Sequence, residues 1–412
     1  MNRRNENMFT AKIYFLLITF VFYSSIFSAY IGTTIFTYLI MIYLILSNIN
    51  RFKFSPFQII AIIILIVYSI IVIGISNDYL VAIKNIRFWL GIIFYLIFLT
   101  LLDLNRFYTP TFFRIVCYSV FLELVLINSL DYNYLINFIN VENYKHFNFY
   151  FRPLGFTGSP SMTSSLIVVL FFLTEKINGR MQLLDWILFI LAVLLTYSSS
   201  GYIIFLLYLI FRSSDLIKQV LLLNIFGLSA KNAISMILTA IVVYYAYKLA
   251  IILGNEDKVG TNFHFYSRIS SDYIWHIFNL KLTEYSHTFG LISNPIINCD
   301  LACRATISDS PANTELIRHN FSLIQLFGYQ ILNNSPSTSG HNGLTIFLSV
   351  MGLFGISIYA LLLLSFYRAG NKMIYGVVLI LIASLHYPSA MSAAGQLLLA
   401  SMIIYNAKKI KI

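Results

Sequence analysis

The sequence predicts an all-α polytopic membrane protein, and three observations lead to that fold class. Of the 412 residues, 59% are hydrophobic and 10% are charged, whereas a soluble domain has about 45–50% apolar and about 25% charged residues. The mean hydropathy is +0.80. Apolar runs repeat along most of the chain, each near the ~17–25 residues with which a helix crosses a bilayer, so helices are expected rather than a barrel.

Taken in order, the apolar runs give about twelve candidate transmembrane helices. They lie at 11–29, 31–47, 57–75, 82–102, 111–130, 161–174, 182–198, 201–211, 232–253, 341–363, 373–387 and 391–406. The eighth run is short, and the following stretch 216–228 is either part of it or an interfacial helix. The expected count is therefore about eleven to thirteen, within a single membrane domain that spans residues 1–412.

Lysine and arginine fall in alternate loops, and this sets the expected orientation because positive residues in short loops stay cytoplasmic. The cytoplasmic segments then hold Arg51, Lys53, Arg106, Lys176, Arg180, Arg212, Lys218, Lys231, Arg368, Lys372, Lys408, Lys409 and Lys411. Both termini are therefore expected in the cytoplasm. The net charge of +11 is mainly a signal of topology and only weakly one of anionic partners.

The two longest non-apolar segments are expected on the opposite, periplasmic side. One is a first loop at 131–160, and the other is a large loop late in the chain, at 254–340. Within the large loop, aromatic and aliphatic residues at helical spacing over 262–282 indicate a helix on the membrane surface. Cys299 and Cys303 of this loop either form a local disulfide or remain two free thiols. Cys117 lies in a span and is expected to pack there.

Motifs of soluble enzymes are absent: the sequence has no Walker-type phosphate loop, no zincin helix and no recognisable metal-ligand spacing. Polar chemistry collects instead at the predicted periplasmic boundary, in three places. The first is YFRPLGFTGSPSMTSS at 150–165, where Arg152 stands beside serine and threonine hydroxyls. An arginine fork can hold two phosphate oxygens, but composition alone favours an interfacial anchor that snorkels to lipid headgroups.

The second place is the large loop, where Arg268 precedes Trp275 within the predicted surface helix. The face of a tryptophan can pack against a sugar ring beside a phosphate-binding cation, although aromatic residues also gather at ordinary membrane interfaces. Arg304 and Arg318 are further cations of this loop without a distinguishing context.

The third place is STSGHNGLTIFLSVMGLFG at 337–355, in which His341 and Asn342 directly precede an apolar run. Histidine exchanges protons near neutral pH, and the small residues before it leave room for a substrate. The alternative is that Ser339 or Gly340 caps a helix and that His341 is an ordinary first-turn residue. Three such places on one predicted face favour a functional site.

Together these places resemble the O-antigen polymerase and ligase superfamily. The resemblance rests on R-x-x-G before a span (Arg152, Gly155), S-R with a following tryptophan in a large loop (Arg268, Trp275), and G-H-N before a G-x-x-G span (Gly340, His341, Asn342, Gly352, Gly355). It extends to the topology of nearly the whole chain, with many spans, both ends inside and one dominant outer loop.

The resemblance implies a glycosyltransferase at the periplasmic face of the bacterial inner membrane that acts on undecaprenyl-diphosphate-linked sugars. In a polymerase, the growing glycan moves from its lipid diphosphate to the far end of a newly flipped repeat unit, and undecaprenyl diphosphate leaves. By resemblance, Arg152 and Arg268 would bind the diphosphate and stabilise its developing charge. His341 would accept or orient the proton of the acceptor hydroxyl, and Asn342 would hold His341 or a sugar hydroxyl.

The same resemblance implies no cofactor, since neither a metal ion nor a nucleotide sugar is needed. The expected partners are the lipid-linked donor and acceptor glycans and the membrane lipids, together with a chain-length regulator and a flippase. Nucleic acid is not an expected partner. Trp275, Arg304 and Arg318 would contact the substrate.

The sequence departs from the family pattern after the seventh span. Many members carry S-R-x-G there, whereas this chain has TYSSSGYI, with Ser199 at the place of the arginine. Arg87, near the outer end of the fourth span, is the candidate replacement, and snorkelling beside Lys84 is the alternative explanation. Glu123 lies inside an apolar run, where a carboxylate costs roughly a few kcal/mol in lipid. We therefore expect it to make a hydrogen bond inside the bundle rather than take part in catalysis.

Two other functions fit parts of the pattern. A ligase that passes finished glycan to the lipid A core would share the fold and the site, and R-P-L-G in the first outer loop favours a polymerase over it. A flippase or transporter of lipid-linked glycans would share the topology. A transporter more often keeps its polar residues at the bilayer midplane and does not need a long outer loop.

Overall fold

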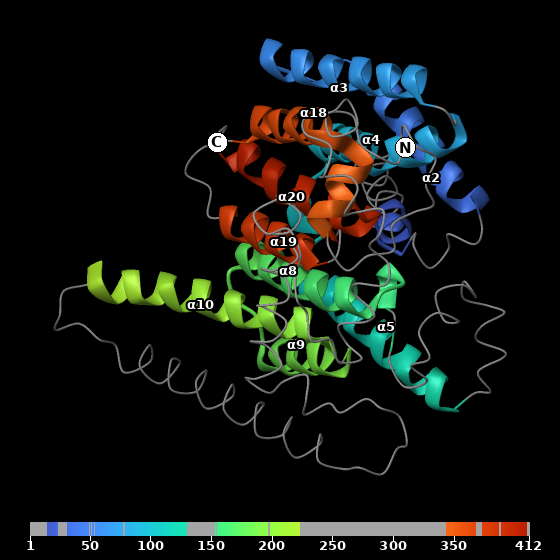
Figure 1. The fold of residues 1–412 in the computed structure, drawn as a ribbon. Helices are drawn as coiled ribbons and strands as arrows, with labels where there is room; N and C mark the ends of the chain where they lie inside the picture. The colour runs from blue at the N-terminus through green and yellow to red at the C-terminus, as the bar shows by residue number, and fades with distance from the viewer. Residues whose placement is uncertain are drawn as a thin grey trace, which may run out of the picture.

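The computed structural model describes residues 15–23, 31–48, 50, 52, 54–76, 79–129, 153, 155–196, 198–222, 343–367, 373–386 and 389–409. In these ranges the chain is helical and has no strand (Figure 1), as the sequence predicts. Two helices, α3 (Pro56–Ile75) and α8 (Pro160–Asn178), are long and apolar enough to cross a membrane by length and composition. The described part is compatible with a helical membrane protein, whereas the number of crossings stays a prediction.

The described helices coincide with the predicted apolar runs. A first helix covers 15–22, and the others are α2 (Ile31–Ser47), α3, α4 (Tyr79–Thr100), α5 (Pro110–Ser129), α8, α9 (Leu183–Leu195), α10 (Ser199–Leu222), α18 (Gly343–Phe366), α19 (Ile374–His386) and α20 (Ala393–Lys409). Short 3-10 turns are η3 (Leu104–Arg106), η4 (Gly155–Thr157) and η5 (Ser389–Met391). The predicted span at 232–253 and the large loop at 254–340, with its surface helix and two cysteines, lie outside the described residues.

The eighth predicted span is longer than its apolar run. Helix α10 continues from Ser199 to Leu222, so residues 216–222 belong to this helix rather than to a separate interfacial one. Hydropathy falls at Arg212, but no proline or glycine stands between Arg212 and Gly227. Helix-compatible residues therefore carry the helix beyond the end of the apolar signal.

Local sequence signals set several helix ends. At the start of α3, the Gln58 N–H donates to Ser55 Oγ at 3.3 Å and the Ser55 N–H donates to Gln58 Oε1 at 2.9 Å. This capping box is followed by Pro56 at the first helical position. Pro160 begins α8 in the same way, and Gly179, with a φ of 78°, ends it.

Helix α8 is the centre of the described bundle. It packs against α5, α9 and α10 on one side and against α19 and α20 on the other (Figure 1). Helix α20 in turn packs against α4, α4 against α2 and α3, and α3 against α18. Every residue of α8 from Thr163 to Thr174 is buried, which is the pattern of a helix that is apolar on all sides and surrounded by protein.

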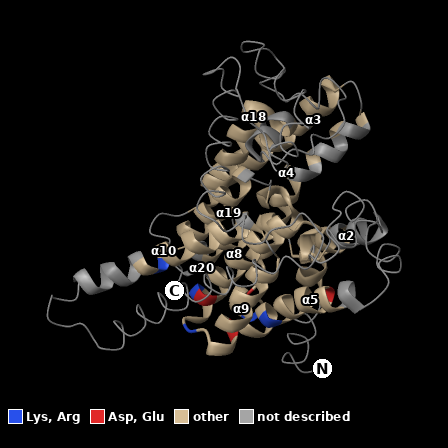
Figure 2. Cartoon of the chain, turned by 60° about the horizontal axis from the view of Figure 1, so that its bottom comes forward, with Lys and Arg blue, Asp and Glu red and all other residues tan. Residues whose placement is uncertain are grey.

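The consecutive helices α8, α9 and α10 alternate in direction, so the bundle has two ends with different chemistry. At one end α8 and α10 begin, and at the other α5 and α9 begin. We call the end where α8 and α10 begin the hydroxyl end, after Thr157, Ser159, Ser161, Thr163 and Ser198. We call the end where α5 and α9 begin the charged end, after Arg114, Glu175, Asp185 and Arg212. Figure 2 shows the coloured charged residues gathered mainly around α9, at the charged end.

Helix α18 has an established direction only after its kink. Tyr108, which follows α4, contacts Ser401 in the middle of α20, and its carbonyl oxygen accepts from Asn178 at the end of α8, so α4 finishes at the charged end. Helix α3 precedes α4 and runs opposite to it. Phe54, just before α3, packs against Phe366 at the end of α18 with ring centroids 6.1 Å apart. Residues 353–366, which follow the kink at Gly352, therefore run toward the charged end.

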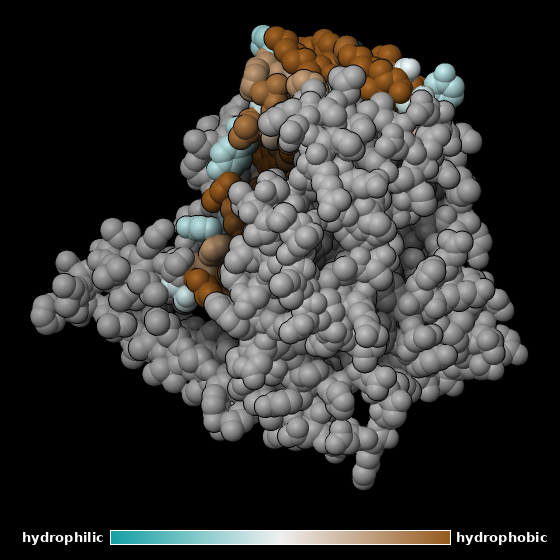
Figure 3. Space-filling view, viewed as in Figure 1, coloured by the Kyte–Doolittle hydropathy of each residue, from teal (hydrophilic) through white to brown (hydrophobic). Residues whose placement is uncertain are grey.

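The exposed surface of the described helices is largely apolar. Helix α3 exposes Ile59, Ile60, Ile63, Ile66, Val67, Ile70 and Ile71, and this helix forms the brown edge at the top of Figure 3. Large exposed apolar side chains also lie on α2, α5, α9, α10, α18 and α19, while Asp185 and Gln396 are buried. An apolar exterior around polar interior groups is what a lipid environment favours.

The G-x-x-G of the tenth predicted span has a local structural use. Helix α18 is kinked at Gly352, where φ is 62° and ψ is 177°. The Tyr68 hydroxyl of α3 donates a hydrogen bond to the Met351 carbonyl oxygen at the kink. A side chain at Gly355 would collide with Tyr68. Gly352 thus permits the kink and Gly355 the close approach of α3.

Candidate functional site

The glycine of the R-x-x-G motif begins the 3-10 turn η4, which we call the Gly155 turn (Gly155–Thr157). Gly155 has a φ of 66°, a left-handed conformation that favours glycine, and a side chain there would collide with Thr163. The Gly155 N–H donates a 2.7 Å hydrogen bond to Glu123 Oε2 in α5. The hydrogen bond expected for Glu123 is therefore confirmed.

Hydroxyl groups close the Gly155 turn against the start of α8. Thr157 Oγ1 donates to the Ser159 carbonyl oxygen at 2.9 Å and accepts from the Ser159 N–H at 3.2 Å. It also lies 2.7 Å from Thr163 Oγ1. Since Thr157 already donates to Ser159, Thr163 supplies the proton of this last pair. Short polar side chains thus satisfy backbone groups that the helix start leaves unpaired.

The connection from α9 to α10 meets α8 at the same end. Ser198 Oγ donates to Ser161 Oγ at 3.0 Å and lies 2.9 Å from Ser200 Oγ. Gly201, in the first turn of α10, faces Ser164 so closely that an added Cβ would collide with it. The SSSG stretch therefore allows α10 to pack tightly on α8.

Three buried hydroxyl groups have no hydrogen-bond partner within the described part of the chain: Ser159, Ser164 and Ser389. Ser159 and Ser164 belong to the start of α8, and Ser389 belongs to η5, which packs against α8. A buried hydroxyl group without a protein partner usually forms a hydrogen bond with water or a ligand. The N-termini of α8 and α10 add a positive potential. The hydroxyl end therefore holds buried polar groups that the described helices leave without a partner.

Replacing Gly201 by alanine is expected to lower the free energy of unfolding by roughly 1–3 kcal/mol, because the methyl group forces α8 and α10 apart. Denaturant titration of the detergent-solubilised protein measures the change. Gly74→Ala is the matched control, since nothing lies within 4 Å of a Cβ added to Gly74 in α3. It should be neutral or slightly stabilising. Equal losses in the two variants would contradict the close approach at Gly201.

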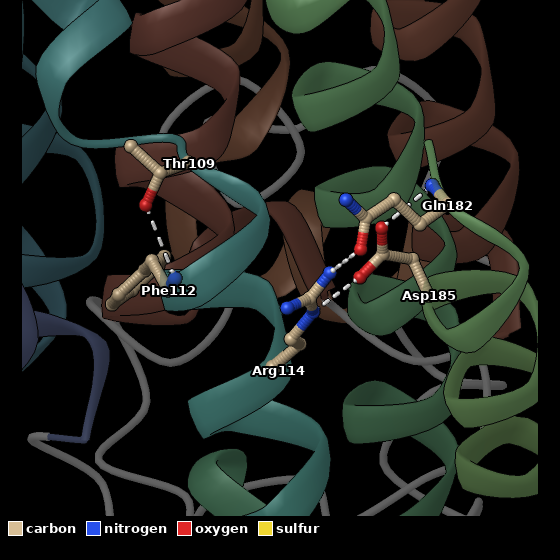
Figure 4. Close-up of polar contacts among 5 residues, drawn as sticks. All are labelled: Thr109, Phe112, Arg114, Gln182 and Asp185. Atoms are coloured by element: carbon tan, nitrogen blue, oxygen red, sulfur yellow. Dashed lines mark hydrogen bonds and ion pairs between the residues drawn. The ribbon is translucent and has the colours of Figure 1, made fainter. Parts of the chain in front are cut away.

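The charged end contains an ion pair between α5 and α9 (Figure 4). Arg114 Nε donates to Asp185 Oδ1 at 2.6 Å, and Arg114 Nη2 donates to Gln182 Oε1 at 2.7 Å. The Gln182 N–H donates to Asp185 Oδ2 at 2.8 Å. The Asp185 side chain is fully buried, whereas that of Arg114 is 26% exposed. The pair joins the first turn of α9 to the start of α5, where Thr109 caps the helix.

Replacing Arg114 by methionine is expected to cost about 3 kcal/mol of stability, because Asp185 then stays buried without its cation. Arg106→Met is the matched control: Arg106 pairs with Asp103, and their side chains are 67% and 52% exposed. An exposed pair contributes roughly 0–1 kcal/mol. Denaturant titration of the two variants compares the losses, and similar values would show that burial of Asp185 has no energetic weight.

A second ion pair connects the last turns of α8 to the second half of α10. Arg212 Nε lies 3.1 Å from Glu175 Oε1, and the Tyr208 hydroxyl donates to Glu175 Oε2 at 2.6 Å. The Arg212 guanidinium also stacks on Trp186 of α9, with Cζ 4.3 Å from the ring centroid. Glu175, Tyr208 and Arg212 pair with one another and with the Trp186 ring, so the charged end holds α8, α9 and α10 together.

Tyr108 also joins helices at the charged end. Its hydroxyl lies 2.6 Å from Ser401 Oγ in α20, and its carbonyl oxygen accepts from Asn178 Nδ2 at 2.7 Å. Burial raises the pKa of the Tyr108 hydroxyl above its ordinary value. The group therefore stays protonated and serves as a hydrogen-bonding contact between the loop before α5 and its neighbours.

Seven of the eight predicted site residues lie outside the described residues: Arg152, Arg268, Trp275, Arg304, Arg318, His341 and Asn342. Arg87 lies in α4, which packs against α20, α2 and α3, but its side chain is also outside the description. The roles assigned to all eight stay predictions. Among the described residues, no group of three His, Cys, Asp or Glu side chains is placed to hold a metal ion.

Sequence reasoning missed the residues that brace the helices. Asp185 carried a signal, because it stands three residues after Gln182 at the start of an apolar run, the spacing of a capping box. Arg114 carried a weaker one, since an arginine inside an apolar run is expected to face a partner. Tyr68 carried only a faint one, because it and the adjacent Ser69 interrupt an otherwise apolar helix.

Comparison of the chain with protein-family models, with curated proteins and with solved structures found no match. The functional conclusion therefore rests on the motifs of the chain and the geometry of its hydroxyl end.

Proposed function

We propose that the chain is an inner-membrane protein of about twelve spans, with both termini and the charged end in the cytoplasm and the hydroxyl end in the periplasm. The distribution of charge supports this orientation. Arg106, Arg114, Arg180 and Arg212 belong to the charged end, and Glu123 is the only charged residue with a described side chain at the hydroxyl end. Arginine-rich short loops stay on the cytoplasmic side.

At the periplasmic end we propose that the protein polymerises undecaprenyl-diphosphate-linked oligosaccharide repeat units into O-antigen or a related surface polysaccharide. The hydroxyl oxygen of the acceptor unit attacks the anomeric carbon of the growing glycan. The bond from that carbon to the diphosphate oxygen breaks, and undecaprenyl diphosphate leaves. The proton of the acceptor hydroxyl passes to His341. The reaction consumes no nucleotide sugar and uses no metal ion.

The observation that carries this proposal is the Gly155 turn, which is fixed at the hydroxyl end just after Arg152 in the sequence. Consecutive Cα atoms are about 3.8 Å apart, so Arg152 stands within roughly 11 Å of Gly155 and His341 within roughly 8 Å of Gly343. Gly343 is the first residue of α18. We propose that both motifs lie at one end of the bundle, beside the N-termini of α8 and α10.

Each predicted residue has a role in this reaction. Arg152 and Arg268 bind the diphosphate, where negative charge grows as the glycosidic bond breaks, so they stabilise the transition state more than the ground state. The partial positive charge of the helix N-termini acts in the same direction. Asn342 orients His341 or a sugar hydroxyl. Further substrate contacts are proposed for Arg87, Trp275, Arg304 and Arg318.

Complementation tests the proposal. A strain that lacks its polymerase but makes the matching repeat unit receives the wild type, an empty vector or the double variant Arg152→Ala/His341→Ala, each checked for equal membrane levels. The wild type should restore a ladder of surface glycan on a gel, and the double variant should give a single capped repeat unit. Arg180→Ala removes an exposed cation of the charged end and should keep the full ladder.

Other outcomes would support the competing functions. Attachment of preformed chains to the lipid A core, without a ladder, would identify a ligase. Movement of repeat units across the membrane without polymerisation would identify a flippase. A full ladder from the double variant would remove Arg152 and His341 from the mechanism.

A further inference from the structure

The Gly155 turn is held by contacts from three directions, and one of these contacts is with the carboxyl group of Glu123 in α5. We propose that Glu123 is a positioning residue: by accepting the Gly155 N–H it fixes the turn, and thereby the direction in which the preceding chain presents Arg152 to the lipid diphosphate. This inference rests on the proposed function. It assigns a role to a carboxyl group that belongs to none of the motifs.

The first hold on the turn is the hydrogen bond from the Gly155 N–H to Glu123 Oε2, with 2.7 Å between nitrogen and oxygen. Glu123 is carried by α5, whose opposite end is tied to α9 through Arg114 and Asp185. In apolar surroundings an unpaired backbone N–H is costly, so Gly155 keeps this partner. The acceptor oxygen is thus held in place by a braced helix.

The second hold is the packing of Phe156, which is fully buried. Its ring centroid lies 4.3 Å from that of Phe22 and 6.1 Å from that of Tyr23, at the end of the helix at 15–22. The Tyr23 hydroxyl lies 2.8 Å from Ser119 Oγ, one helical turn before Glu123 in α5. The N-terminal helix and α5 together therefore form a socket for Phe156.

The third hold comes from α8. The Thr157 N–H donates to Thr163 Oγ1 at 3.3 Å, and the two side-chain oxygens lie 2.7 Å apart. Thr163 also occupies the space that a side chain at Gly155 would need. Among these holds, the Glu123 contact acts on the N–H of Gly155, the turn residue nearest to Arg152 in sequence.

The short link to Arg152 makes the position of the turn matter. Pro153 is buried, and its ring restricts the backbone between Arg152 and the turn. A shift of Gly155 is therefore passed to the arginine. A guanidinium stabilises the leaving diphosphate only when it is aimed at the phosphate oxygens, and a displacement of about 1 Å can cost about a hundredfold in rate.

Three variants of the full-length protein test the inference: Glu123→Ala, Glu123→Gln and the control Asp103→Ala, which removes an exposed carboxyl group at the charged end. Amide hydrogen exchange over residues 153–160, measured by mass spectrometry, reports on the turn independently of activity. Glu123→Ala should speed exchange there about tenfold, because the Gly155 N–H loses its acceptor. Glu123→Gln keeps an acceptor oxygen, and Asp103→Ala leaves the contact intact, so both should exchange at nearly the wild-type rate.

Transfer of glycan between lipid-linked substrates supplies the second readout. Glu123→Ala should lose about 10–100-fold in rate, with kcat falling more than KM changes, because a misplaced Arg152 fails mainly in the transition state. The glutamine variant should restore most of the rate. Asp103→Ala should be fully active.

Several results would overturn the inference. Unchanged exchange in Glu123→Ala would do so, as would faster exchange with an unchanged transfer rate. A glutamine variant as slow as the alanine variant would also overturn it, because the charge of Glu123 and not its hydrogen bond would then be what the reaction needs. An inactive wild type would contradict the proposed function itself, and the wild-type sample alone identifies that case.

Discussion

Replacing His341 by alanine is expected to lower the rate of glycan transfer by about 10²–10⁴-fold, the contribution typical of a general base. The acceptor hydroxyl must lose its proton as its oxygen attacks the anomeric carbon, and an imidazole accepts protons near neutral pH. The rate is measured with purified protein and saturating lipid-linked donor and acceptor, so that the loss reports on the chemical step rather than on binding.

Two further variants isolate proton transfer from hydrogen bonding. His341→Gln keeps a hydrogen-bonding side chain but cannot accept a proton at neutral pH, so it should be nearly as slow as the alanine variant. His319→Ala changes another histidine of the predicted periplasmic loop and should keep the wild-type rate. A fast glutamine variant would limit His341 to orienting the substrate and would contradict its role as a base.

The helix positions could be predicted because long apolar runs are a strong signal. Helix α2 covers the predicted run 31–47 in full, and α3 begins one residue before the predicted run 57–75. Helix α10 was predicted too short because hydropathy falls at Arg212, whereas helix formation depends on propensity and caps. Hydropathy alone locates the lipid-crossing part of a helix better than the end of the helix itself.

Side-chain partners were much less predictable. That Glu123 needs a hydrogen bond follows from the cost of a carboxyl group in lipid, and the structure confirms it, but the partner is a backbone N–H of a loop far along the chain. Tyr68 meets the α18 kink because of how α3 is rotated, and a uniformly apolar helix does not encode its rotation in its periodicity. The proposed catalytic residues were predicted from the order of short motifs, and their side chains lie outside the described residues.

Replacing Arg152 by alanine is expected to slow glycan transfer by about 10²–10³-fold, comparable to the loss of one preorganised donor from an oxyanion site. In the proposed reaction the diphosphate gains negative charge as it leaves. Arg152 precedes Gly155 by three residues, and Glu123 and Thr163 hold the turn that begins at Gly155. The loss should fall mainly on kcat, because the interaction strengthens in the transition state. Initial rates of polymer formation at saturating substrate measure it.

Lysine at this position separates charge from geometry. Arg152→Lys restores a cation but not the planar fork that meets two phosphate oxygens, so it should recover part of the rate and remain about tenfold below wild type, the equivalent of one charge-assisted hydrogen bond. A lysine variant equal to wild type would mean that a point charge suffices.

Arg87→Ala gives the comparison: a loss similar to that of Arg152→Ala would support Arg87 as the cation that replaces the arginine missing at Ser199. Full activity would mean that the site works without it.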